Sequence, residues 1–175
     1  MGQFREMTPG GRIFQRIYIT IMLWFVGRAI VAASKADPEV AEEFEKLPAG
    51  FTFALGVLPS GLRMVIRKKR SGRVTYLGQA KGEAVDLDMT IKNMQAFFLI
   101  FSFQESTPTA NARARLFVDG SVPEACAVVR VLDVVQVHLL PKFIAKLAVK
   151  RYPKWSLKRH TLTRGMVYLR TLSGI

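Results

Sequence analysis

The stretch AVDLDMTIK, residues 84–92, alternates apolar and polar side chains with a period of two. Its apolar members fall on one side of an extended chain: Val85, Leu87, Met89 and Ile91. Residues 62–69 repeat the pattern, and turn residues at 59–61 and 71–72 separate the extended segments. Strands that are buried on one face and joined by short turns are typical of an antiparallel sheet. We therefore predict an antiparallel, meander-like sheet.

Helical patterns surround this sheet. An apolar helix is expected over about 12–35, and a short acidic helix over 37–47, with Asp37 as its cap and Pro38 at its first position. Asn93 is expected to cap a phenylalanine-rich helix. A loop containing Pro108 leads into a strand at 114–120, whose Leu116 and Val118 are expected to face inward. The fold class is α+β, with helices covering the sheet.

Two more helices are expected after this strand. One begins at Pro123, and the other runs from about His138 to Pro153 with an interruption at Pro141. Four of the predicted helices are apolar beyond a single stripe, and a helix that is apolar all round is normally buried on all sides. A domain of 175 residues with an amphipathic sheet offers little surface to bury four of them. The apolar helix surface that the sheet cannot cover would be explained by a lipid-filled cavity, a dimer interface, a membrane, or simply a large core.

Few side chains in the sequence suggest catalysis. His138 and His160 have no neighbouring carboxylate at the spacing of a metal site or a catalytic triad, although pairing in space stays open. Cys126 lies between alanines and is interpreted as a small core residue; as the single cysteine it forms no internal disulfide. Asp86 and Asp88 would share one strand face, as a site with paired carboxylates requires, but the polar side of any amphipathic strand has the same spacing, and we favour that interpretation. We predict no enzyme, no metal site and no cofactor, although a bound lipid or fatty acid is possible.

The charge distribution predicts an anionic partner. The net charge is +13, and residues 134–175 contain nine Lys and Arg side chains but no Asp or Glu. Such a field attracts phosphate backbones or anionic lipid headgroups, although a solvated basic face kept for solubility is the simpler alternative. Tyr152, Trp155 and Tyr168 could stack on bases in this tail, but no nucleic-acid recognition motif accompanies them.

The N-terminal region resembles a signal peptide, because the uncharged run 17–27 follows Arg5, Arg12 and Arg16. Arg28 interrupts the run, and a membrane span needs about 20 apolar residues. We expect this helix to dock on the domain, to mediate a homodimer, or to lie in a membrane interface.

Two segments carry a family resemblance. The segment DLDMTIKNMQAFFLIF resembles the sterol carrier protein 2 family through Asp88, Thr90, Ile91 and Asn93. The segment STPTANARARLFVDG resembles the loop and strand that follow in that family, through Ala110, Ala114, Arg115, Leu116, Val118 and Gly120. Pro108 stands one position later than is usual there, and Ala114–Arg115 replaces Gly-Lys.

The resemblance covers roughly residues 51–147. Within the family, LDVVQVHLLPKFIAKL is similar to the bacterial lipid-binding accessory proteins of ubiquinone biosynthesis. The resemblance implies a non-enzymatic lipid or isoprenoid carrier with an apolar tunnel between sheet and helices. The residues expected to line that tunnel are Phe97, Phe98, Phe101, Leu116, Val118, Val128, Val129 and Leu132.

The leading hypothesis is a carrier that acts at an anionic membrane surface as a cytoplasmic, peripherally attached protein. The expected membrane contacts are Ile17, Trp24, Phe25, Lys142, Lys146, Lys150, Arg151 and Lys158. The chain is divided into a helical arm at 1–48, a lipid-binding domain at 49–150 and a basic tail at 151–175. A membrane-associated scaffold or dimerisation module without a cavity is the alternative, and nucleic-acid binding through the tail ranks third.

Overall fold

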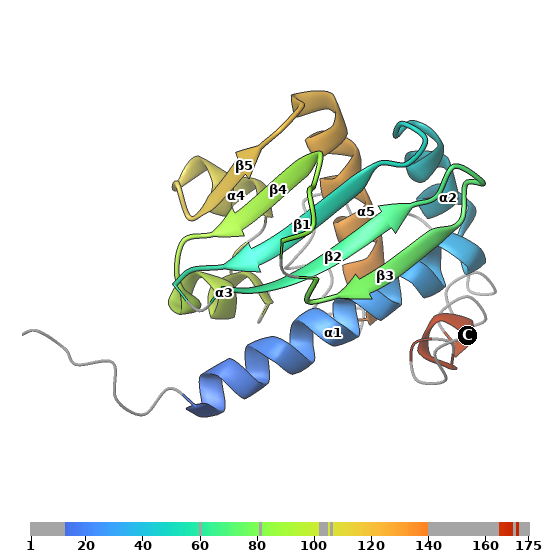
Figure 1. Cartoon of the computed structure of the whole chain (residues 1–175). Coiled ribbons are helices and arrows are strands. Elements are labelled where there is room, and N and C mark those ends of the chain that lie inside the picture. The colour runs from blue at the N-terminus through green and yellow to red at the C-terminus, as the bar shows by residue number, and fades with distance from the viewer. Residues whose placement is uncertain are drawn as a thin grey trace, which may run out of the picture.

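The computed structural model describes residues 13–59, 61–80, 82–101, 105, 107–139, 165–169 and 171. The described strands form a five-stranded sheet with the order β3-β2-β1-β4-β5 (Figure 1). The strands are β1 (Thr52–Val57), β2 (Leu62–Lys68), β3 (Val74–Gly78), β4 (Leu87–Ile91) and β5 (Leu116–Asp119). The helices are α1 (Ile13–Ala36), α2 (Pro38–Glu45), α3 (Met94–Phe101), α4 (Thr107–Ala112) and α5 (Val122–Leu139).

The sheet is mixed, so the prediction of a purely antiparallel sheet is wrong. The pairs β1–β2, β2–β3 and β4–β5 are antiparallel, but β1 pairs with β4 in parallel. The segment between β3 and β4 crosses the face of the sheet opposite α1 and α5 (Figure 1). Arg63 holds this crossover, since its guanidinium donates hydrogen bonds to the carbonyls of Ala80 at 2.7 Å and Glu83 at 3.0 Å.

The alternation that predicted β4 is confirmed. Leu87, Met89 and Ile91 are buried, whereas Asp88 and Thr90 are half-buried on the other face. The buried side chains face the layer formed by the long helices, because alternate residues of a strand point to opposite faces. This register gives the helix-covered face of the sheet a continuous apolar surface.

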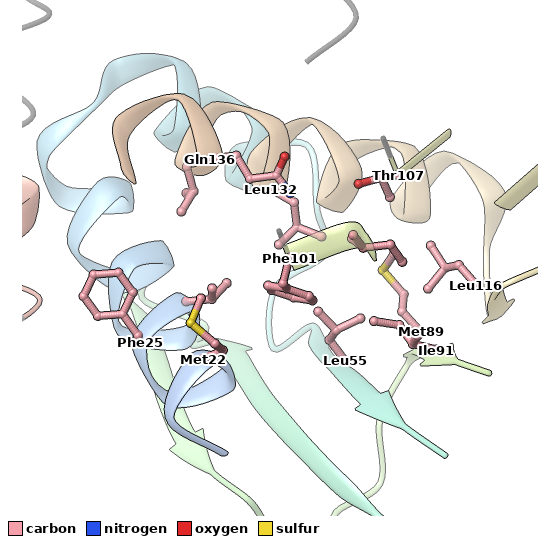
Figure 2. A pocket seen from close by; sticks show the side chains of 13 residues that line it. Met22, Phe25, Leu55, Met89, Ile91, Phe101, Thr107, Leu116, Leu132 and Gln136 are labelled. Atoms are coloured by element: carbon pink, nitrogen blue, oxygen red, sulfur yellow. The ribbon is translucent and has the colours of Figure 1, made fainter. Parts of the chain in front are cut away.

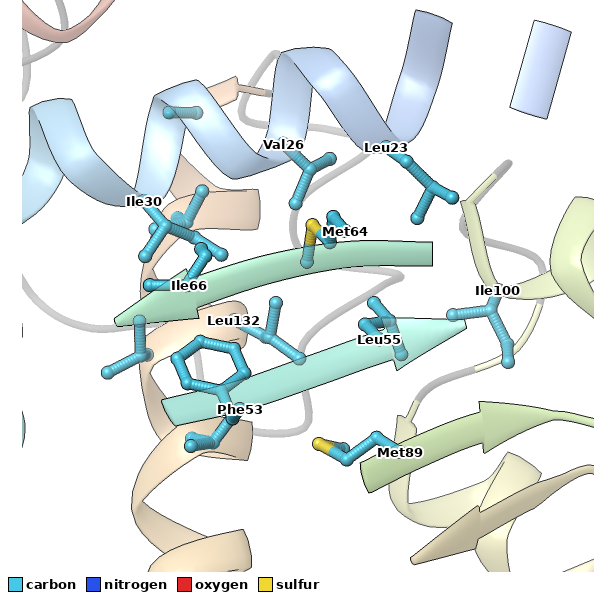
Figure 3. Packing of buried hydrophobic residues seen from close by; sticks show 14 of the residues in the cluster. Leu23, Val26, Ile30, Phe53, Leu55, Met64, Ile66, Met89, Ile100 and Leu132 are labelled. Atoms are coloured by element: carbon cyan, nitrogen blue, oxygen red, sulfur yellow. The ribbon is translucent and has the colours of Figure 1, made fainter. Parts of the chain in front are cut away.

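One side of α1 forms the main helix contact with the sheet. Its buried side chains Leu23, Val26 and Ile30 point toward Met64 and Ile66 of β2 (Figure 3). Gly27 lets the helix approach β3 closely, because a Cβ atom there would lie only 2.7 Å from the ring of Tyr76. The first helix is therefore part of the core, and α1, α2 and the sheet share one hydrophobic cluster.

The predicted helix caps are confirmed. The Asp37 carboxylate accepts a hydrogen bond of 2.8 Å from the backbone N–H of Glu39 and caps α2, with Pro38 at the first position. The Asn93 side chain accepts one of 2.7 Å from the N–H of Ala96 and caps α3. Each cap satisfies a helix N–H that has no partner within the helix.

The segment around β5 differs from the sequence prediction in several places. A short helix, α4, replaces the predicted loop that contained Pro108. Leu116 is buried as expected. Val118 pairs with Met89 and so lies on the same helix-facing side of the sheet, but it is 37% exposed. Gly120 turns the chain into α5, with φ of 139° and no room for a Cβ atom beside the carbonyl of Asp86.

Three further outcomes concern α5 and the segments after it. Cys126 is exposed, so its interpretation as a core residue is wrong. His138 lies inside α5 and does not begin a new helix. The rest of the helix predicted over 138–153, and most of the basic tail, lie outside the described residues. The division of the chain at residues 48 and 150 stays a prediction.

Candidate functional site

An apolar pocket of about 120 Å³ lies between the long helices and the sheet. Figure 2 shows Met22 and Phe25 of α1 on one side, Leu132 of α5 above, and the side chains that rise from β1 and β4 on the opposite side. The lining residues are Met22, Phe25, Val26, Leu55, Met89, Ile91, Ile100, Phe101, Thr107, Leu116, Leu132, Val135 and Gln136. We call this space the inner pocket.

The lining of the inner pocket is suited to hydrocarbon. Only Thr107 and Gln136 among its lining residues carry polar side chains, and none is ionisable. Water in such a space would find few hydrogen-bond partners, and cavities of this kind stay dry or bind apolar molecules. The inner pocket therefore offers binding through the hydrophobic effect, with at most two polar contacts.

A second hollow, which we call the outer groove, lies between α4, β5 and α5 and has a volume of about 390 Å³. Its lining residues are Thr107, Asn111, Leu116, Val118, Val122, Ala125, Cys126, Val129 and Arg130. Thr107 and Leu116 line both spaces. The two hollows are therefore neighbours separated by shared side chains.

The predicted lipid-binding residues do not share one site: some line the inner pocket, some line the outer groove, and some line neither. Phe101, Leu116 and Leu132 line the inner pocket, and Leu116, Val118 and Val129 line the outer groove. The other three line neither of these spaces: Phe97, Phe98 and Val128. That set therefore stays a prediction as a ligand site, although five of its eight members lie around the two hollows.

The three remaining residues of the set pack within the fold. Phe97 is fully buried, and its ring stacks on Phe101 with centroids 4.1 Å apart. Phe98 stacks on Tyr18 of α1 at 5.0 Å, and Val128 is fully buried in the core. These contacts join α3 and α5 to the rest of the domain.

The contribution of α1 to the inner pocket is not indicated by the sequence pattern. Phe25, predicted as a membrane contact, is half-buried and lines the pocket together with Met22 and Val26. The signal was weak because α1 is apolar on several sides, and its pattern does not mark which side meets the sheet. The strand residues Met89 and Ile91 were predicted to face inward, but not assigned to a site.

A row of exposed apolar side chains follows the side of α1 opposite the core. Ile13, Ile17, Ile21 and Trp24 are spaced four, four and three residues apart, which places them on one helix face, and all are exposed. We call this row the outer stripe. The Arg28 guanidinium lies 4.8 Å from the Trp24 ring centroid, in a cation–π contact at the end of the stripe.

Two of the predicted membrane contacts, Ile17 and Trp24, belong to the outer stripe. The predicted basic contacts Lys142, Lys146, Lys150, Arg151 and Lys158 lie outside the described residues. By length and composition, one helix among the described residues could cross a membrane, namely residues Arg16–Ala36. Within that segment, 44% of an apolar 18-residue stretch is buried in the domain, and the segment includes the side chains that pack on β2. A membrane crossing would therefore require α1 to leave the core.

A buried polar pair joins α5 to the start of α2. His138 Nε2 lies 2.8 Å from Asp37 Oδ2, and both side chains are fully buried. No sequence pattern indicates this pair, because its members are 101 residues apart. The carboxylate also caps α2, so the pair ties the α1–α2 corner to α5.

Two acidic groups near α5 have shifted pKa values. Burial raises the pKa of Asp133 to about 6. Burial alone would also raise the pKa of Glu43, but hydrogen bonds from Lys46 and Arg130 outweigh it, and the pKa lies below its ordinary value. Arg130 Nη1 donates to Glu43 Oε2 at 3.0 Å and so links α5 to α2. In the described residues, no cluster of His, Cys, Asp and Glu could hold a metal ion.

The chain is an α+β domain with an inner pocket lined almost entirely by apolar side chains and an outer groove beside it. No protein-family model and no curated protein matches the sequence. Solved structures do match, and among them are sterol carrier protein 2 domains, the family that the sequence resembles.

One match is a UbiJ-SCP2 ubiquinone synthesis protein, with 12% identity, a TM-score of 0.47 and coverage of 69% of this chain and 97% of that one. Another is the sterol carrier protein domain 2 of Helicoverpa armigera, with 18% identity, a TM-score of 0.41 and coverage of 75% and 94%. A third is the apo form of sterol carrier protein 2 from Yarrowia lipolytica, with 19% identity, a TM-score of 0.43 and coverage of 66% and 91%.

Proposed function

We propose that this chain is a non-enzymatic lipid-binding protein that holds the hydrocarbon part of a lipid in the inner pocket. The observation that carries the proposal is an apolar lining without ionisable groups, contributed by α1, α3, α5 and the sheet. Each buried methylene is worth about 0.8 kcal/mol, so a hydrocarbon chain binds such a surface without specific polar contacts.

The test starts with native mass spectrometry of the full chain after gentle purification. A co-purified lipid, or uptake of lipid from vesicles, is the expected result. A fluorescent fatty acid then reports affinity, with displacement by oleate, cholesterol and a polyisoprenoid alcohol as separate arms. The polyisoprenoid arm is included because residues 132–147 resemble the ubiquinone-biosynthesis accessory proteins. A protein that carries no lipid and takes up none would overturn the proposal.

A pocket-filling variant tests whether the ligand lies in the inner pocket. Val135 is buried and lines it, so Val135→Phe adds a ring to a space of about 120 Å³ and should weaken fatty-acid binding at least about 10-fold. Leu58→Phe adds a ring at an exposed position that lines neither hollow, and should leave affinity unchanged. Equal affinity of both variants and the wild type would place the ligand elsewhere.

We further propose that the outer stripe attaches the protein to an anionic membrane surface. A row of exposed isoleucines and a tryptophan, with Arg16 and Arg28 on the same helix, combines apolar contact with positive charge, as interfacial helices do. The net charge of +13 favours the same partner. Sedimentation with anionic vesicles and with neutral vesicles tests this, and binding to neither while a dimer forms would favour the scaffold alternative.

A further inference from the structure

The inner pocket is too small for a whole lipid. Its volume is about 120 Å³, whereas an engineered apolar cavity of about 150 Å³ holds a single benzene molecule. A long hydrocarbon chain bound there must continue into a second space. The neighbouring hollow is the outer groove, which is about three times larger and shares Thr107 and Leu116 with the inner pocket.

Accordingly, we propose that the outer groove is the second half of the ligand site and holds the polar end of a single-chain anionic amphiphile, such as a fatty acid. This inference rests on the lipid-binding function proposed above. The hydrocarbon end passes between Leu116 and Thr107 into the inner pocket, and the headgroup stays at the rim of the outer groove.

The lining of the outer groove supports this division. Its floor is apolar through Val118, Val129 and Ala125, so it continues the surface of the inner pocket. Its polar side chains are Thr107, Asn111 and Arg130, and Arg130 is the one charged residue among those that line it. A guanidinium beside an apolar floor matches an anionic headgroup on a hydrocarbon chain.

Arg130 has capacity for a headgroup in addition to its bond to Glu43. A guanidinium has five N–H donors, and Glu43 receives one hydrogen bond from it at 3.0 Å. The Arg130 side chain is 58% exposed, so a ligand carboxylate can contact it without any rearrangement of neighbouring elements. Glu43 keeps a second partner in Lys46 at 2.7 Å if the arginine is changed.

The first experiment compares two neighbours on β5. Val118→Asp places a carboxylate in the outer groove, whereas Phe117→Asp places one on the opposite side of the same edge strand. Both positions are exposed, so both variants should fold. Val118→Asp is expected to weaken oleate binding at least 10-fold, and Phe117→Asp to change it less than twofold.

The second experiment separates the headgroup from the chain. Arg130→Gln should weaken oleate binding about 10-fold, which corresponds to one charge-assisted hydrogen bond. The same variant should bind oleyl alcohol within twofold of the wild type, because that ligand carries no charge. Equal losses for both ligands would overturn the assignment of Arg130 to the headgroup.

The third experiment uses the wild-type chain and needs no change to the groove. Cys126 is the single cysteine, is exposed, and lines the outer groove. Saturating oleate should slow its reaction with a thiol reagent at least fivefold. In a Cys126→Ser, Gln95→Cys double variant, the thiol lies at an exposed position on α3 outside both hollows, and oleate should not protect it.

These outcomes distinguish the inference from the function on which it rests. If oleate binds the wild type but neither protects Cys126 nor responds to Val118→Asp, the outer groove is not part of the site and the inner-pocket proposal stands. If no lipid binds the wild type at all, both proposals fail together.

Discussion

On the side of α1 that faces the sheet, Ile19, Leu23 and Ile30 are at most 1% exposed, whereas Ile13, Ile17 and Ile21 on the outer stripe are at least 50% exposed. The two sides carry the same kinds of side chain, so hydrophobicity does not separate them. What separates them is the partner: β2 and β3 cover one side, and no described element covers the other. An apolar residue in this helix therefore contributes to folding or to binding according to its side.

The difference also explains why α1 has an unusual composition for a core helix. A helix that packs on a sheet needs one apolar face, and its solvent face is normally polar. The outer stripe departs from that rule over three turns, from Ile13 to Trp24. Exposed apolar rows of this kind mark surfaces that meet a partner, and the proposed partner is a membrane.

The largest expected effect is on the buried side of α1. Ile30→Ala removes methyl groups from a fully buried site against the sheet, and should lower the free energy of unfolding by about 2–4 kcal/mol. Ile17→Ala on the outer stripe should change it by less than about 0.5 kcal/mol. Urea denaturation followed by circular dichroism measures both. Similar losses for the two variants would mean that the outer stripe is also covered.

The next largest effect on stability is expected at Asp37, between the end of α1 and the start of α2. Asp37→Ala removes the α2 cap and leaves a fully buried His138 without its carboxylate partner, so the free energy of unfolding should fall by about 2 kcal/mol. Asp37→Asn retains an oxygen for the cap and should lose less. The same denaturation experiment compares them, and equal stability of the alanine variant and the wild type would contradict the role assigned to this pair.

The period-two and capping patterns predicted much of this fold because they are local. The buried face of β4, the cap of α3 by Asn93 and the start of α2 at Pro38 each depend on residues close in sequence. The parallel pairing of β1 with β4 was not predictable in the same way. Alternation is the same in parallel and antiparallel strands, and the crossover held by Arg63 decides the direction.

The candidate site was predictable only in part for a related reason. Leu116 and Leu132 were expected to be apolar and inward, and both line the inner pocket. The contribution of Met22 and Phe25 depends on the angle at which α1 crosses the sheet, and no local pattern encodes that angle. The pairing of His138 with Asp37 likewise arises only from tertiary contact.

Substitutions in the outer stripe are expected to weaken vesicle binding without lowering the stability of the fold. The double variant Ile17→Asp, Ile21→Asp should reduce binding to anionic vesicles about 10- to 100-fold, because two apolar contacts are lost and two charges must enter the interface. Its unfolding midpoint should stay close to that of the wild type, since both positions are exposed.

The matched control for this variant carries the same charge change elsewhere. Ser71→Asp, Ser121→Asp alters two exposed loop positions and also lowers the net charge by two, so any shared loss reflects long-range electrostatics alone. If the two double variants lose vesicle binding equally, the outer stripe makes no direct membrane contact. Analytical ultracentrifugation of both shows whether the stripe joins two copies instead.

The smallest expected effect comes from a single half-buried charge on α5, Asp133, whereas Arg16 beside the outer stripe is exposed. Burial raises the pKa of Asp133 from 3.8 to about 6, so the folded state holds this proton more tightly than the unfolded state. The contribution of this proton to the free energy of unfolding is therefore present below about pH 4 and is lost as the pH rises through about 6.

Asp133→Asn should match the wild type near pH 4 and exceed its free energy of unfolding by about 1–2 kcal/mol near pH 8, after allowance for partial exposure. Ile30→Ala, which involves no proton, should lose the same amount at both pH values. A stability gain for Asp133→Asn that did not change with pH would show that packing at this position, and not its charge, sets the cost.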